Sequence, residues 1–128
     1  MKPSKRLKYL KIALVVVGAI FLLGVYPLTI LWPAGWVWHH DQSFYLQMIM
    51  GIYASLGVFL ILAARNPLEH LSLIWFTVWS SIVHGGIMAV QAWSAPEHRA
   101  HLLGDVPALL IVAGVLAWLT PRAKQARG

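Results

Sequence analysis

The sequence predicts an all-α integral membrane protein in which four transmembrane helices form one antiparallel, up-down bundle. Three observations predict this class. The chain contains four apolar runs of about 20 residues or more, and each is long enough to cross a hydrocarbon core of about 30 Å. The composition is 59% hydrophobic and 11% charged, with a mean hydropathy of +0.70, which is too apolar for a soluble domain of 128 residues. Lys and Arg lie mostly outside the runs, as they do beside membrane spans.

The first span is predicted over about 10–31. It begins like a signal peptide, because a basic segment precedes the apolar run. The run is longer than a signal peptide's apolar region, and no clear pattern of small residues for cleavage follows it. We therefore expect an uncleaved span, in which Pro27 lies near the outer end, where a kink is tolerated.

The second span is predicted over about 44–64 and the third over about 71–93. Arg65, Asn66 and Pro67 end the second span, since a proline disfavours helix at the residue before it. The connection between the two spans is therefore expected to be short.

The fourth span is predicted over about 95–120, with Pro121 as its stop. Ser94 and Glu97 fit a capping box, in which Ser94 is the N-cap and Glu97 lies three residues later. A helix that began only at Val106 would contain about 14 apolar residues and extend about 21 Å, which is too short to span. The segment 32–43 has no clear period and is expected to lie in the membrane interface.

The distribution of charge predicts the orientation. If the N-terminus is cytoplasmic, nine of the ten Lys and Arg residues lie on cytoplasmic segments, and only Arg99 lies outside. This bias predicts that both termini are cytoplasmic, and it makes the net charge of +6 a topology signal, not a nucleic-acid patch. The partners expected are the lipid bilayer and no nucleic acid. Aromatic residues mark both interfaces: Trp32, Trp36, Trp38 and Trp93 outside, Tyr9 and Trp118 inside, and Trp75 about one turn further in.

Spans two and three each carry a small, polar face. The third span places its polar residues and one methionine within an arc of about 100°: Thr77, Ser80, Ser81, His84, Met88 and Gln91. Beside them runs a row of small residues, Ser81, Gly85 and Ala89, and the second span has a similar face, Gln47, Gly51, Ala54 and Ser55. Such rows allow close approach of helices. They exceed what one helix pair needs, so we expect a homo-oligomer or a larger membrane complex.

The fourth span opens with His98, His101 and Asp105, whose spacing of three and four places them on one helix face. A tight turn at 94–95 would set three pairs at equal depth: Gln91 with His98, Met88 with His101, and His84 with Asp105. A carboxylate inside the bilayer costs about 2.5–3.5 kcal/mol on insertion scales, so a His84–Asp105 clamp is predicted. The alternative makes Asp105 a simple N-cap, with Pro107 just behind it.

The outer half of the protein also offers ligand chemistry. The absence of Cys removes disulfides, thiolate metal sites, iron–sulfur clusters and covalent haem. A metal site and a proton-linked role stay open, because imidazole and carboxylate groups gather there: His39, His40, Asp41, His84, Glu97, His98, His101 and Asp105. A b-type haem is disfavoured because spans one and two have no His in mid-membrane.

Two further classes are weaker. A hydrolase could use Ser80 or Ser81 beside His84, but no nucleophile elbow or glycine-rich oxyanion loop accompanies them. Transport by one subunit is disfavoured, because there is no pair of broken helices of the transporter kind.

Two stretches, "GIYASLGVFLILAARNPLEHLSLIWFTVWSSIVHGG" and "HLLGDVPALL", resemble an uncharacterised bacterial family of small four-span membrane proteins, a domain of unknown function. The resemblance covers roughly 48–119 and implies the architecture but no activity. We therefore expect a structural or accessory protein of a bacterial inner membrane, with no cofactor and no enzymatic reaction. The alternative is an embedded metal-binding, ligand-binding or proton-linked protein, whose candidate residues are His84, Asp105, His101, His98 and Gln91.

Overall fold

The computed structural model describes residues 1–37 and 44–122, and within these ranges the chain is helical and contains no strand. Four helical segments are long and apolar enough to cross a membrane: Pro3–Leu31, Phe44–Ala63, Pro67–Ser94 and Pro96–Leu119. The predicted all-α class with four spans is therefore confirmed. Some residues used in the sequence argument lie outside the described ranges: Trp38, His39, His40, Asp41, Lys124 and Arg127.

The first span is a helix that changes its winding. Helix α1 covers Pro3–Ala19, a π-helical turn η1 covers Ile20–Gly24, and α2 covers Val25–Leu31. Pro27 explains the change, because it has no N–H for the carbonyl of Leu23 and its ring crowds that carbonyl. The π turn widens the helix just before the proline. A short helix, α3 (Pro33–Trp36), then follows within the segment 32–43, whose sequence shows no clear period.

The next two spans match their predicted ranges closely. Helix α4 covers Phe44–Ala63 and α5 covers Leu71–Ser94. The predicted stop at Pro67 is the first residue of a short 3-10 helix, η2 (Pro67–His70), which leads directly into α5. Proline suits this position because the first N–H groups of a helix have no partner within it.

The fourth span covers nearly the predicted range, Pro96–Leu119, but it is not one continuous α-helix. A 3-10 helix, η3, covers Pro96–Leu102, and the α-helix α6 begins only at Asp105 and ends at Leu119. The predicted capping box is wrong: Ser94 ends α5, and its Oγ donates to the carbonyl of Val90 at 2.8 Å. A 3-10 segment rises about 2.0 Å per residue, whereas an α-helix rises about 1.5 Å. The seven residues of η3 therefore cover the missing depth without an α-helix.

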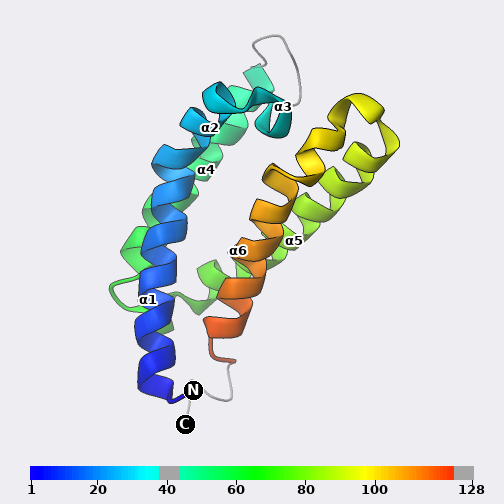
Figure 1. Cartoon of the computed structure of the whole chain (residues 1–128). Helices are drawn as coiled ribbons and strands as arrows, with labels where there is room; N and C mark the ends of the chain where they lie inside the picture. Colours follow the sequence, from blue (N-terminus) through cyan, green and yellow to red (C-terminus); the bar gives the residue numbers. More distant parts are fainter. Residues whose placement is uncertain (38–43, 123–128) are drawn as a thin grey trace.

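The helices pack as two pairs that come together toward the end of the molecule where α1 begins and α6 ends (Figure 1). Helix α1 packs against α4, α5 packs against α6, and α1 also contacts α6. The core between them is apolar and includes Leu10, Leu14, Leu60, Ile74 and Leu116, all fully buried. Large apolar side chains cover the outside of the same helices, for example Leu23, Ile52, Phe76, Val90 and Ile111. That arrangement suits a lipid solvent.

Two glycines bring α1 and α4 into backbone contact. A Cβ added at Gly18 would lie 2.6 Å from the carbonyl oxygen of Gly57. A Cβ added at Gly57 would lie 2.5 Å from the carbonyl oxygen of Gly18. The predicted small face of α4 is a different one, since Gln47, Gly51 and Ser55 are exposed. The seam that joins α4 to α1 therefore runs through Gly57.

The predicted small-residue row of α5 does form a seam. Ser81 and Gly85 are buried, and a Cβ at Gly85 would lie 3.2 Å from Leu110 Cδ2 and 3.5 Å from Leu109 Cβ. The predicted depth register is wrong, however, because it would place Gly104 beside Gly85. The chain between α5 and α6 is longer than a tight turn. Compared with the predicted register, α6 is therefore shifted along α5 by more than one helical turn.

Candidate functional site

His101 is the centre of a buried polar site at the start of the fourth span. Its side chain is 1% exposed, and both of its ring nitrogens contact protein oxygens. Nδ1 lies 3.0 Å from Oδ1 of Asp105, one helical turn onward, and Nε2 lies 3.2 Å from the carbonyl oxygen of Val37. One imidazole thus joins η3, the first turn of α6 and the chain that follows α3.

Two glycines build the local geometry that brings Val37 to His101. Gly104 lies between η3 and α6, at φ −104° and ψ −105°. A Cβ added there would lie 2.4 Å from the carbonyl oxygen of Gly35, so only glycine fits at this contact. Gly35 belongs to the short helix α3, which begins at Pro33. The close contact between Gly35 and Gly104 therefore places α3 directly against η3. Val37 follows α3 and presents its carbonyl to the ring.

The hydrogen-bond inventory of this site assigns its protons. A carbonyl oxygen only accepts, so Nε2 of His101 carries a hydrogen and donates it to Val37. The contact between Nδ1 and the carboxyl of Asp105 then needs a second proton, which resides on the ring or on the carboxyl. In both arrangements the pair carries no net charge. A buried pair without net charge avoids most of the cost of an isolated charge in an apolar medium.

A second polar contact joins α4 to α5. The phenol of Tyr53 and Nδ1 of His84 are joined by a hydrogen bond. The two ring centroids are 5.7 Å apart. Phe21 packs edge-on against Tyr53, with ring centroids 5.0 Å apart at 77°, and this contact fixes the phenol from the first span.

Asp105 links the two contacts through space. Its carboxyl interacts electrostatically with both Tyr53 and His84, in addition to its hydrogen bond with His101. The polar network, which we define as Tyr53, His84, His101 and Asp105, therefore draws on α4, α5, η3 and α6. With Phe21 and Val37 at its two ends, it touches every span of the protein.

The predicted pair of His84 and Asp105 does not form a hydrogen bond, because each residue bonds another partner. His84 bonds Tyr53 and Asp105 bonds His101, because the real register moves His84 past the level of Asp105. The alternative assignment of Asp105 as an N-cap is also wrong, since Gly104 is the N-cap and Asp105 is the first residue of α6.

The other predicted residues are distributed unevenly. His98 is half-buried, and its ring centroid lies 5.7 Å from that of His101, because residues three apart are eclipsed in a 3-10 helix. Gln91 is exposed and lies outside the network. On the predicted polar face of α5, Thr77, Ser81 and Met88 are buried, as expected for a face that points inward.

Neither metal nor hydrolytic chemistry gains a geometric basis in the described part of the chain. Within residues 1–37 and 44–122, no three His, Asp or Glu side chains gather as a metal-binding group. The hydroxyl of Ser80 donates to the carbonyl of Thr77 at 3.3 Å, so it bonds the backbone of its own helix. His39, His40 and Asp41 lie outside the described residues.

Sequence reasoning missed Tyr53 and Val37. A signal for Tyr53 exists, because a tyrosine in the middle of an apolar span needs a partner for its hydroxyl. Val37 contributes only its backbone carbonyl, for which the residue type carries no signal.

Comparison with known proteins gives a family and no activity. The model of one family, described as a family of unknown function (DUF6632), matches residues 4–127. No curated protein matches the chain, and no solved structure does. Since the match extends over nearly the whole chain, the protein belongs to DUF6632, a family of unknown function.

Proposed function

We propose that this protein is a structural or accessory component of a bacterial inner membrane, without enzymatic activity, in which the polar network clamps the four spans together. The observation that carries the proposal is the way His101 is bonded. Both of its nitrogens form hydrogen bonds with protein oxygens, and the phenol of Tyr53 forms a hydrogen bond with His84. The polar groups thus satisfy one another across helix boundaries, which is how a clamp differs from an open binding site.

A proton-linked role is the second candidate, and one observation favours it. Two hydrogen-bonded pairs of ionisable groups, Tyr53 with His84 and His101 with Asp105, lie near enough for the charge of Asp105 to act on both members of the other pair. Series of histidine and carboxylate groups relay protons in pumps and transporters. The two roles differ in whether Asp105 must be able to ionise, and the variants described in the Discussion separate them.

We further propose that both termini are cytoplasmic and that consecutive spans alternate in direction. The support is the nine-to-one distribution of Lys and Arg, together with Arg6 and Arg122, which lie at one end of the molecule. A reporter enzyme fused after Gly128 should be active only in the cytoplasm, and one inserted in 33–42 only on the opposite side. A cytoplasmic signal from the 33–42 insertion would contradict this topology.

We also propose that α4 joins the protein to a second copy of itself or to a larger membrane complex. Gln47, Gly51 and Ser55 are exposed on α4, and a Cβ at Gly51 would meet nothing within 4 Å. A small, polar strip facing lipid is unusual, because polar groups in a bilayer seek partners.

Gly51→Leu should therefore weaken association while leaving the stability of the isolated chain unchanged. Native mass spectrometry of the detergent-extracted protein measures the oligomer fraction. Gly86→Leu is the matched control, since Gly86 is also an exposed helix glycine with nothing within 4 Å of its added Cβ. Equal effects of the two substitutions, or a monomer throughout, would contradict the proposal.

A further inference from the structure

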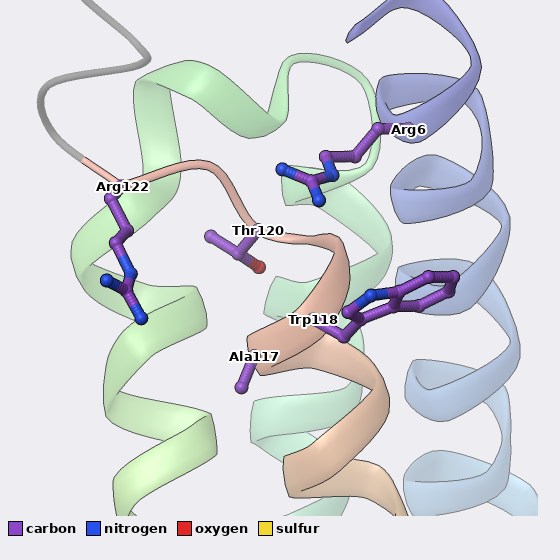
Figure 2. A pocket seen from close by; sticks show the side chains of 5 residues that line it. All are labelled: Arg6, Ala117, Trp118, Thr120 and Arg122. Carbon is purple, nitrogen blue, oxygen red and sulfur yellow. The ribbon is translucent and has the colours of Figure 1, made fainter. Parts of the chain in front are cut away.

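The end of the molecule where α1 begins and α6 ends contains a hollow of about 430 Å³. Its lining residues come from both helices and from the chain after α6: Arg6, Ala117, Trp118, Thr120 and Arg122. Figure 2 shows the side chain of Thr120 between the two arginines, with Arg6 reaching across from α1. The hollow is far from the polar network, which lies at the other end of α6.

The charge of the lining favours an anion. Two guanidinium groups contribute to it, and none of the five lining residues is acidic. The N-terminal end of α1, a helix of 17 residues, is also here, and its unpaired N–H groups add positive potential. The C-terminal carbonyls of α6 oppose this effect, but a helix end amounts to about half an elementary charge, less than either arginine carries.

Thr120 supplies an independent observation. It is 3% exposed, and among the residues that the structure describes its Oγ1 is a buried side-chain oxygen with no hydrogen-bond partner. Its backbone N–H is satisfied by the carbonyl of Leu116 at 2.9 Å, whereas the hydroxyl lacks such a bond. A buried hydroxyl without a partner is costly. Its position on the wall of a basic hollow indicates that a ligand atom supplies the missing bond.

Trp118 places the hollow at the level of lipid headgroups. Its side chain is 62% exposed at the end of an apolar helix, which is where tryptophan anchors a span in the interface. Two forked guanidinium groups and a hydroxyl match the donors that a phosphate group takes. We propose that this hollow binds the phosphate of an anionic phospholipid, with Arg6, Thr120 and Arg122 as its donors.

The competing explanation is that the arginines only cap the last carbonyls of α6, as basic side chains commonly do. That explanation gives no role to the hydroxyl of Thr120. Replacing a buried hydroxyl that has no partner by a methyl group should then be neutral or stabilising, with or without lipid. The phosphate site instead makes the effect of this replacement depend on anionic lipid.

The test is a titration of the full-length protein with phosphatidylglycerol, followed by native mass spectrometry, with phosphatidylcholine as the neutral lipid. Arg6→Gln is expected to weaken the apparent Kd for phosphatidylglycerol about tenfold or more, since it removes hydrogen bonds to a charged group. Thr120→Val should weaken it as well, and neither substitution should change the retention of phosphatidylcholine. Arg6→Lys keeps the charge without the fork and is expected to fall between Arg6→Gln and the unaltered protein.

Lys11→Gln is the control, because Lys11 is an exposed cation on α1 that does not line the hollow. Loss of a diffuse surface charge should weaken binding by about fivefold at most. Equal losses for Lys11→Gln and Arg6→Gln, or no effect of Thr120→Val, would overturn the site. If inorganic phosphate raises the Tm as much as phosphatidylglycerol does, the source is free phosphate and the lipid assignment fails. These outcomes do not depend on the clamp, because the polar network is unchanged in every variant.

Discussion

Gly57→Leu is expected to separate α1 from α4 and to destabilise the fold by more than about 3 kcal/mol, beyond the usual cost of overpacking. The reason is that the contact at Gly57 is made by backbone. A Cβ would lie 2.5 Å from the carbonyl oxygen of Gly18 and 3.0 Å from the backbone nitrogen of Leu22. Neither atom can move by a change of rotamer, so the helices themselves must shift. Unfolding by a denaturing detergent, followed by circular dichroism, measures the loss.

The matched control for this substitution is Gly114→Leu. Gly114 lies within α6, is exposed, and has nothing within 4 Å of an added Cβ. Both substitutions exchange a helix glycine for leucine, so the gain in helix propensity of up to about 1 kcal/mol is shared and cancels in the comparison. If the two variants unfold at the same detergent concentration, the helices do not approach closely at Gly57.

His101→Ala and Asp105→Ala should each destabilise the protein by about 3–5 kcal/mol, because each strands a buried partner in a low dielectric. The double substitution should cost less than the two single costs combined, since the two residues are in direct contact. The same detergent unfolding measures all three. A parallel cycle on His84 and Asp105 should give a smaller coupling, because those two groups interact electrostatically and bond other partners. Additive losses for His101 and Asp105 would contradict the clamp.

Asp105→Asn then separates the clamp from the proton-linked role. An asparagine amide can donate to Nδ1 of neutral His101 while Nε2 still donates to Val37, so both hydrogen bonds survive without the shared proton. A clamp should therefore retain most of its stability in this variant. A proton-linked protein should show a step in stability near neutral pH that the variant loses. A flat pH profile in the unaltered protein would leave the clamp as the role of the site.

The parts of the fold that are set locally could be predicted from sequence. The lengths of the apolar runs and the stop at Pro67 define spans two and three to within one or two residues. The relative depth of α5 and α6 could not be predicted, because it depends on how 96–104 is wound. A 3-10 helix there, followed by Gly104 against Gly35, moves every cross-helix pair by more than one turn.

The candidate site was predicted only in part, because some of its contacts are local in the sequence and others depend on how the helices pack. The spacing of four predicts that His101 and Asp105 share one face of an α-helix, but it was used to assign them partners on α5, and their bond to each other was not predicted. The partner of His84 depends on which face of α4 meets α5, and several small residues of α4 made more than one face plausible. The glycine that sets this face is Gly57, which lies beyond the predicted row and contacts α1 backbone to backbone.

The winding of η3 also determines how the protein fits its bilayer. Because the polar segment Pro96–Leu102 is 3-10 helix, the apolar part of this span is α6 alone, whose 15 residues extend about 22 Å. Helix α4 has 20 residues and extends about 30 Å. The two flanks therefore differ in the length of their apolar α-helix, since the depth that η3 adds is polar, and we expect the bilayer to be thinner beside α6 than beside α4. Hydrophobic mismatch of this kind sorts proteins among membranes of different thickness, so seven residues at the edge of one span bear on where the whole chain resides.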